Sequence, residues 1–261
     1  MNFIYNVENR LINVKDDTGS IIAEYYYDPF GRRIFKEVGG TRTYYLYSDE
    51  GLIGEYDSSG IEIKTYGYKP DTTWTTDTLF MKENGNYYFY HNDHLGTPMV
   101  MTDISGNLVW SAAYDSFGKA DVQPSSTIEN NLRFPGQYFD EETGFHYNWN
   151  RYYDPTTGRY ITTDPLWFTG RDVNLYRYVG NSPINFIDPW GLLTSVFEPG
   201  FDSESPLKGP GKPGILREDP DVGIAVQLGI FDISYSSENG VSVSLTTPGL
   251  GCRFRLPIIS I

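Results

Sequence analysis

The sequence predicts an all-β chain built from antiparallel hairpins, and two observations support this. First, the composition is rich in aromatic and turn-forming residues, with 22 Tyr, 15 Phe, 27 Gly and 16 Pro in 261 residues. Aromatic residues favour strands, while Gly and Pro favour the tight turns that join strands. Second, one strand-and-turn unit recurs along the chain, which is typical of a repetitive sheet.

The repeated unit is clearest in two segments that align without gaps. Residues 17–33 read DTGSIIAEYYYDPFGRR, and residues 104–120 read ISGNLVWSAAYDSFGKA. A weaker third copy, SSGIEIKTYGYKPD at 58–71, keeps the same spacing between Gly60 and Tyr68. Each copy predicts a turn containing Gly, a strand of about seven residues that ends in Tyr, and a second turn that begins with Asp.

Three aromatic segments lie between or after these copies and are predicted to be their partner strands. They are TRTYYLY at 41–47, NYYFYHND at 86–93 and FHYNWNRYYD at 145–154. Ladders of Tyr stack across neighbouring strands and fix their register, so we interpret the tyrosines as structural rather than as a carbohydrate-binding platform.

The composition changes after residue 192. Residues 193–222 form a predicted linker, because they are dense in Pro, Gly, Ser and charge. Residues 223–261 form a predicted small β module of three strands. The expected strand segments of this C-terminal module are VGIAVQLGIFDISYS (222–236), NGVSVSLTT (239–247) and CRFRLPIIS (252–260).

Charge and residue counts exclude several classes of function. The formal charge of −14, without a cluster of Lys and Arg, argues against nucleic acid as a partner. The only cysteine, Cys252, allows no intrachain disulfide, and the three scattered histidines suggest no metal site; we expect no cofactor. The N-terminal residues do not resemble a signal peptide, and no segment has the length of about 18 apolar residues that a membrane helix needs.

Two features of the sequence resemble the RHS or YD-repeat family. The repeat signature Tyr-Asp-x-x-Gly occurs at residues 27–31 and at 114–118. Much more specific is the match to the RHS-associated core, at 133–192, whose residues from 134 read FPGQYFDEETGFHYNWNRYYDPTTGRYITTDPLWFTGRDVNLYRYVGNSPINFIDPWGL. The resemblance divides the chain into YD repeats at 1–132, the core, the linker and a variable C-terminal module.

The resemblance implies a fold and a function. Family members wind β-hairpins into a hollow shell that encloses a C-terminal polypeptide, commonly a toxin, and the core closes one end. We therefore expect a partial shell, an antiparallel hairpin arc with the core as its plug, at the C-terminal end of a secreted polymorphic toxin. Its expected partners are its own tail, further RHS repeats or another shell protein, and an immunity protein. A dedicated secretion system would carry it out of the cell or to the cell surface.

Relatives are often cut after an Asp-Pro-x-Gly-Leu motif by aspartate-dependent self-cleavage, which here places the cut between Leu192 and Leu193. Leu193 cannot act as a nucleophile, so an activated water is the remaining route. Two carboxylates can activate water if one stays ionised as the base and the other stays protonated as the acid. The candidates are Asp164 and Asp188, which are the aspartates that the resemblance implies, with Asp172 as a third.

The arginines Arg159 and Arg171 could hold or polarise this site. An alternative interpretation is that the Asp-Pro pairs are only turn formers. One position departs from the family pattern, because Trp167 stands where Gly is usual in the first Asp-Pro motif. A residue of this size is not expected to tolerate a positive φ, and it could move the carboxylate of Asp164.

The C-terminal tail carries no motif that assigns it an activity. Residues 193–261 contain no histidine and have a formal charge of −3, from eight acidic and five basic residues, which argues against a nuclease. Asp232 and Glu238 are interpreted as solubilising residues at strand ends, and Cys252 as a packed apolar residue.

Two other classes of function compete with the toxin shell. One is a structural or adhesive cell-surface module of YD repeats that is never cut. The other is a carbohydrate-processing enzyme with Glu141 and Glu142 as its acids. The enzyme is the weaker hypothesis, because adjacent residues on a strand point in opposite directions and the local sequence reads as a turn.

Overall fold

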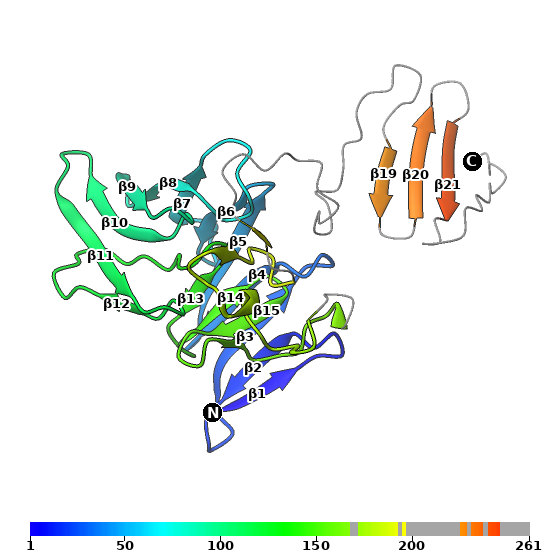
Figure 1. Ribbon diagram of the computed structural model, residues 1–261, viewed down its shortest axis with the longest axis horizontal. Coiled ribbons are helices and arrows are strands. Elements are labelled where there is room, and N and C mark those ends of the chain that lie inside the picture. Colours follow the sequence, from blue (N-terminus) through cyan, green and yellow to red (C-terminus); the bar gives the residue numbers. More distant parts are fainter. Residues whose placement is uncertain (168–171, 193–194, 197–224, 229–230, 237–239, 246–261) are drawn as a thin grey trace. The chain divides into compact units, whose positions relative to one another are not determined.

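The computed structural model confirms the all-β prediction (Figure 1). It describes residues 1–167, 172–192, 195–196, 225–228, 231–236 and 240–245. The chain divides into two compact units, Met1–Asp202 and Ser203–Ile261, and each is described by itself. A short 3₁₀ turn, η2, occupies Val179–Asn181.

The first unit is dominated by one twelve-stranded antiparallel sheet in which every strand pairs with its neighbours in sequence (Figure 1). Its strands are Asn2–Tyr5 (β1), Leu11–Lys15 (β2), Ile21–Tyr27 (β3), Arg33–Val38 (β4), Thr41–Ser48 (β5), Gly51–Tyr56 (β6), Glu62–Tyr68 (β7), Thr78–Glu83 (β8), Asn86–Asn92 (β9), Pro98–Asp103 (β10), Leu108–Tyr114 (β11) and Ala120–Val122 (β12). The sheet is an open arc that begins at β1 and ends at β12.

The three sequence copies form equivalent strands. β3, β7 and β11 are each seven residues long and end in Tyr27, Tyr68 and Tyr114. The turns after the two clear copies have the same geometry. Oδ1 of Asp28 accepts the amides of the residues two and four positions later, at 2.9 and 2.8 Å, and Oδ1 of Asp115 does the same at 2.9 and 3.0 Å. An Asp side chain that replaces main-chain partners in this way makes a tight hairpin turn.

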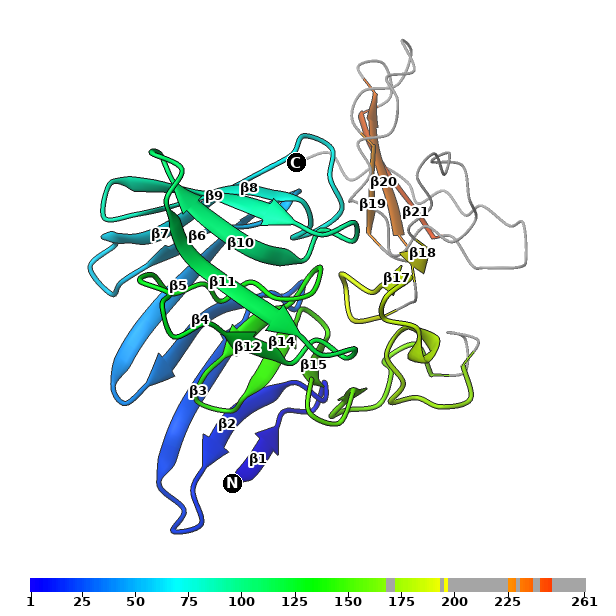
Figure 2. The same ribbon diagram turned by 60° about the vertical axis from the view of Figure 1, so that its left-hand side comes forward.

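A smaller four-stranded antiparallel sheet follows the large one and lies within its curve (Figures 1 and 2). Its strands are Tyr138–Asp140 (β13), Phe145–Asn148 (β14), Arg151–Asp154 (β15) and Arg159–Tyr160 (β16). The expectation of one strand at 145–154 is wrong, because a turn at Trp149 and Asn150 splits the segment into a hairpin. We call residues 133–192 the plug.

The core lies between the inner face of the large sheet and the plug. Side chains alternate along each strand: on β3, Ala23 and Tyr25 are almost fully buried, whereas the side chain of Tyr26 is 61% exposed. Burial of each large apolar side chain contributes about 1.5–3 kcal/mol. The buried residues of this cluster are Leu11, Val14, Ala23, Tyr25, Tyr45, Leu52, Tyr66, Met81, Tyr90, Met101, Trp110, Ala112, Leu132, Tyr138, Tyr147 and Tyr152.

The predicted cross-strand ladder of aromatic residues is present on the outer face. The rings of Tyr26 and Phe35 stack at 5.2 Å between centroids, and Phe35 meets Tyr44 on the next strand at 5.5 Å. These residues are direct partners in the registers of β3, β4 and β5. The aromatic pairs therefore support the register of the sheet, as the sequence indicated.

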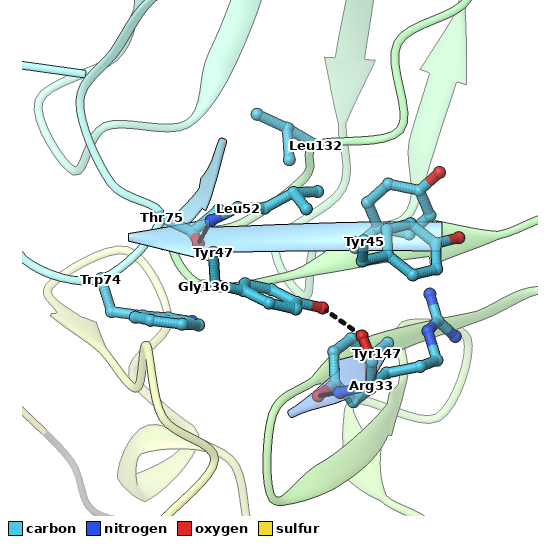
Figure 3. Close-up of a pocket in the computed structure, with 10 residues that line it drawn as sticks. Arg33, Tyr45, Tyr47, Leu52, Trp74, Thr75, Leu132, Gly136 and Tyr147 are labelled. Atoms are coloured by element: carbon cyan, nitrogen blue, oxygen red, sulfur yellow. Dashed lines mark hydrogen bonds between the residues drawn. The ribbon is translucent and has the colours of Figure 1, made fainter. Parts of the chain in front are cut away.

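A buried arginine joins the large sheet to the plug. Arg33, at the start of β4, is 1% exposed, and both of its terminal nitrogens bind the carboxylate of Asp140 in β13. Figure 3 shows Tyr45, Tyr47 and Tyr147 gathered around Arg33 in a small pocket. Burial opposes ionisation of Asp140, but Arg33 and Lys36 hold its pKa below the usual value. Removing one partner of such a buried pair costs about 3–5 kcal/mol, so the pair holds the plug firmly on the sheet.

The plug also covers the turns along one rim of the arc. Trp149 Nε1 donates to the carbonyl of Phe30 at 3.0 Å, and the Tyr153 hydroxyl donates to that of Phe117 at 2.7 Å. Both carbonyls belong to the Asp-x-x-Gly turns of the clear copies. The plug therefore packs against the turns of the repeats and forms hydrogen bonds with their carbonyls.

Downstream of η2, the short strands β17 (Phe186–Ile187) and β18 (Ser195–Val196) pair antiparallel. The second unit contains a three-stranded antiparallel sheet of Ala225–Leu228 (β19), Phe231–Ser236 (β20) and Gly240–Leu245 (β21). The expected strand at 222–236 is therefore wrong, since it contains two strands. The expected strand at 252–260 lies outside the described residues.

Candidate functional site

The junction turn, Asp188 to Leu192, has the same local geometry as the turns of the repeats. Oδ1 of Asp188 accepts the amide of Leu192, four residues later, at 3.0 Å, and the Gly191 amide lies 3.4 Å from the carbonyl of Asp188. The chain at Gly191 has φ of +66°, and a Cβ there would lie 2.4 Å from the carbonyl oxygen of Asn148. Only glycine fits this position. The motif therefore forms a turn, which is compatible both with a turn former and with a cleavage site.

The same aspartate also faces a buried cluster of charged and polar groups. Arg151, at the start of β15, places Nη2 at 3.3 Å from Oδ2 of Asp188 and at 3.1 Å from Oδ2 of Asp164. The side chains of Arg151 and Asp188 are each 3% exposed, and that of Asp164 is 13% exposed. One guanidinium nitrogen thus brings together the two carboxylates that lie 24 residues apart in the sequence.

The hairpin turn between β14 and β15 holds three carbonyls of the junction. Asn148 Nδ2 donates to the carbonyl of Asp188 at 2.9 Å, and Asn150 Nδ2 donates to that of Trp190 at 2.9 Å. Arg151 Nε donates to the carbonyl of Gly191 at 2.5 Å. Trp149 adopts a φ of +44° inside this hairpin turn. The hairpin turn between β14 and β15, which divides the predicted strand, therefore supplies the hydrogen bonds that hold the junction turn in place.

Tyr160 completes the cluster from β16. Its hydroxyl donates to Oδ2 of Asp188 at 2.7 Å and accepts from Asn148 Nδ2 at 3.0 Å. The guanidinium carbon of Arg151 lies 3.6 Å from the centroid of the Tyr160 ring, a stacked cation–π contact. Asp188 is thus surrounded by an amide, a hydroxyl and a guanidinium, all of which stabilise the ionised carboxylate.

Asp164 and Asp172 have different environments. Burial raises the pKa of Asp164 above its usual value, although Arg151 acts in the opposite direction. Asp172 binds Arg177 at 2.6 Å and caps the amide of Asn174, and these contacts hold its pKa below the usual value despite some burial. The two carboxyls therefore have different surroundings: burial raises the pKa of Asp164, whereas Asp188, although more deeply buried, accepts hydrogen bonds from Tyr160 and from the amide of Leu192.

Other predicted residues lie outside this cluster. Arg159 is exposed and precedes Tyr160 on β16, so its side chain points to the opposite face of the strand. Arg171 and Leu193 lie outside the described residues, and Leu192 is buried. Trp167 contradicts our expectation, because it adopts a φ of +50° while its amide donates to the carbonyl of Asp164 at 3.0 Å. The Trp167 side chain is 61% exposed, so its size causes little steric conflict with neighbouring residues.

Sequence reasoning missed the residues that connect the two aspartates, which are Arg151, Tyr160 and Asn148. A signal was present: Asn148 and Arg151 occur in the segment NWNRYYD, and Tyr160 directly follows Arg159. The segment was read as a continuous strand, which would have pointed Asn148 and Arg151 to opposite faces. Among the described residues there is no group of three or more His, Cys, Asp or Glu that could hold a metal ion. No helix in the described parts of the chain is long and apolar enough to cross a membrane.

The junction lies in the loop between β17 and β18. The backbone of Ile187, just before the turn, pairs with Ser195, and that of Phe186 pairs with Val196. The chain on the two sides of the Leu192–Leu193 bond is therefore held together by main-chain pairing as well as by the bond itself.

The repeated hairpins, the plug and the junction define a fragment of a YD-repeat β-shell. A family model described as "Teneurin YD-shell" matches residues 1–184. The chain belongs to this family, as the resemblance to RHS and YD repeats indicated.

Several characterised bacterial proteins are similar to this chain. Double-stranded DNA deaminase toxin A of Burkholderia cenocepacia is 31% identical over 74% of this chain and 15% of its own length. The tRNA nuclease WapA of Bacillus subtilis is 32% identical over 72% of this chain and 8% of its own. Toxin protein Tse5 of Pseudomonas aeruginosa is 43% identical over 40% of this chain and 8% of its own. The chain thus spans a small part of the length of these relatives.

Solved structures confirm the fold. A crystal structure of TcdB2-TccC3-TEV aligns with a TM-score of 0.56 and 22% identity, over 73% of this chain and 10% of the other. The Tc holotoxin pore of Photorhabdus luminescens aligns with a TM-score of 0.55 and 20% identity, over 76% of this chain and 10% of the other.

Proposed function

We propose that this chain is the C-terminal end of the shell of a secreted RHS-type polymorphic toxin, and that it cuts itself between Leu192 and Leu193. The observation that carries the proposal is the position of Arg151 Nη2, within 3.3 Å of both Asp164 and Asp188, directly beside the junction turn. A turn alone does not need a second buried carboxylate or a buried arginine. Buried charges of this kind are costly unless paired, and they gather at functional sites.

The proposed reaction is hydrolysis of one peptide bond. The oxygen of a water forms a bond with the carbonyl carbon of Leu192, and Asp188 accepts one proton of that water. The bond from this carbon to the nitrogen of Leu193 then breaks, and Asp164 gives its proton to that nitrogen. Arg151 stabilises the carboxylates through both steps. The products are a carboxyl group on Leu192 and an amine on Leu193.

The assignment of the two roles follows from the environments. Asp188 accepts hydrogen bonds from Leu192 and Tyr160 and faces Arg151, so it is suited to be the ionised base. Asp164 is suited to be the acid, because burial raises its pKa. Hydrogen bonds from the plug to the carbonyls of Asp188, Trp190 and Gly191 hold the turn that precedes the proposed cut.

The wider role rests on the relatives. Two of the similar bacterial proteins are named as toxins and others as tRNA nucleases, and this chain matches only a fraction of each. Delivery by a dedicated secretion system, enclosure of residues 193–261 as the effector, and an immunity protein are parts of this proposal. The tail's own activity is not assigned by its sequence.

Self-cleavage is tested by the mass of the purified chain after incubation at mildly acidic and at neutral pH. We expect pieces of 192 and 69 residues, and we expect Asp188→Asn and Asp164→Asn to remain intact while circular dichroism stays unchanged. The matched control is Asp115→Asn, which changes the same type of turn carboxylate far from the junction in sequence, and which should be cut at the normal rate. Cutting of both junction variants at the wild-type rate would refute the mechanism.

A structural or adhesive module that is never cut is the second candidate. It is favoured by one observation, that the junction turn repeats the geometry of the turns at Asp28 and Asp115. A wild-type chain that stays one piece throughout the incubation would support this candidate and exclude the first.

A further inference from the structure

Tyr160 lies between the junction and the strands of the plug. It is 2% exposed, and its ring packs against those of Tyr153 and Tyr178, each at 5.7 Å between centroids. Its hydroxyl reaches Oδ2 of Asp188 at 2.7 Å, so it contacts the carboxylate oxygen opposite the one that accepts the Leu192 amide. A tyrosine needed only for packing would not require this hydroxyl.

The direction of the hydrogen bonds around Tyr160 is fixed by its neighbours. Asn148 must present its NH₂ group to this region, because the same nitrogen lies 2.9 Å from the carbonyl of Asp188, which can only accept. That nitrogen therefore donates to the Tyr160 oxygen at 3.0 Å. The single proton of the hydroxyl remains for Asp188. Burial and the nearby Asp188 both raise the pKa of Tyr160, so the hydroxyl keeps this proton.

We propose that Tyr160 is a positioning residue for self-cleavage, whose hydroxyl keeps Asp188 ionised and turned so that its other oxygen faces the amide of Leu192. This inference rests on the proposed self-cleavage. It assigns to the Tyr160 hydroxyl the role of deciding which of the two aspartates acts as the base. A hydroxyl that donates a hydrogen bond to a carboxylate stabilises its ionised form and so lowers the proton affinity of that carboxylate. Without the Tyr160 hydroxyl, the proton that Asp164 needs as the acid is shared with Asp188. The proton affinities of the two carboxyls then differ too little for one to act as the base and the other as the acid.

The groups that face Asp188 come from several elements. They include Arg151 from β15, Tyr160 from β16, Tyr178 before η2, and Asp164 across the guanidinium of Arg151. Arg151 and Asp164 stay in place when only the Tyr160 hydroxyl is removed, so a change in titration can be assigned to that hydroxyl.

The kinetic test compares two matched variants of the full chain. Tyr160→Phe removes the hydroxyl at the junction, while Tyr153→Phe removes an equally buried hydroxyl that bonds the carbonyl of Phe117. Tyr160→Phe loses two hydrogen bonds and Tyr153→Phe loses one, so urea unfolding of both variants is measured to confirm that each is folded in the assay. We expect Tyr160→Phe to be cut at least about tenfold more slowly at neutral pH, with the rising acid limb of its rate profile moved up by about one pH unit. Equal rates and profiles for the two variants would overturn the proposal.

A second measurement does not depend on cleavage. In the Asp164→Asn background, ¹³C NMR of the side-chain carboxyl groups follows the titration of Asp188 directly. Adding Tyr160→Phe should raise its midpoint by about one pH unit, and adding Tyr153→Phe should not. An unchanged midpoint rejects the role of Tyr160. A raised midpoint in a chain whose wild type is never cut supports the hydrogen bond and rejects the proposed function instead.

Discussion

At the residue scale, Asp164 and Asp188 meet at one guanidinium nitrogen of Arg151, which lies 3.1 Å from the first and 3.3 Å from the second. Asp164 and Asp188 could be named because each precedes a proline in a recognisable motif. Arg151 could not be selected in the same way, because its role depends on a turn at Trp149 that contains neither glycine nor proline. The neighbouring Arg159 looked equally suitable in sequence, and only the alternation of β16 shows that Tyr160 faces the junction instead.

A buried histidine makes the stability of the fold depend on pH. His146 is 1% exposed, its Nδ1 lies 2.7 Å from Oε1 of Gln137, and burial together with Arg133 lowers its pKa from 6.5 to about 3. The unfolded chain binds a proton here below pH 6.5, while the folded chain does not until about pH 3. This contribution to stability is therefore present above pH 6.5 and is lost as the pH falls towards 3.

We predict that His146→Gln weakens the acid dependence of unfolding. Between about pH 5 and pH 4, the free energy of unfolding of the wild type should fall by about 1.4 kcal/mol per pH unit more than that of the variant. Urea unfolding at several pH values measures this difference. Parallel curves for the two proteins would show that His146 titrates normally in the folded chain.

At the scale of elements, turns decide where sequence reading succeeded. The seven-residue strands β3, β7 and β11 were predictable because an Asp turn or a Gly turn marks each end. The segment 145–154 was misread because its turn is built from Trp149 and Asn150 between aromatic residues. For the same reason, one strand was expected at 222–236, where the structure has the two strands β19 and β20.

Two glycines in turns of positive φ should respond differently to alanine. Gly106 has φ of +82° and no heavy atom within 4 Å of an added Cβ, so Gly106→Ala should cost only the backbone strain of about 1 kcal/mol. Gly191→Ala adds a 2.4 Å contact with the carbonyl of Asn148 to the same strain. We expect it to lower the urea midpoint further and to prevent the cut. Equal midpoints, with cleavage retained, would contradict the close packing at the junction.

At the scale of the whole molecule, the open arc with its plug was predictable, since the repeats and the core motif are both explicit in the sequence. The attachment of the plug was not predictable, because Arg33 and Asp140 lie 107 residues apart, and neither the repeat that contains Arg33 nor the core motif that contains Asp140 indicates that the two side chains meet. A buried ion pair such as Arg33 and Asp140 forms only where two particular strands meet in the fold. Local sequence patterns do not indicate which distant strands meet.

The tail should stay bound after the cut. A three-stranded sheet as small as that of β19, β20 and β21 buries little surface for stability of its own. The main-chain pairing of β17 with β18 also holds the new terminus to the plug. Size-exclusion chromatography of a cleaved sample should show both pieces eluting together without denaturant. Separate elution of a tail that remains folded would show that it is an independent module.

The pairing of each strand in the arc with its neighbour in sequence sets an order of events during synthesis. A chain that leaves the ribosome N-terminus first can add one hairpin after another to the growing sheet, because every contact needed is local. The plug has to wait, since Asp140 and Trp149 contact Arg33 and Phe30 from more than 100 residues earlier. The junction follows the arc and the strands of the plug in the sequence, so the proposed cut would take place only after every group that holds the junction turn had been synthesised.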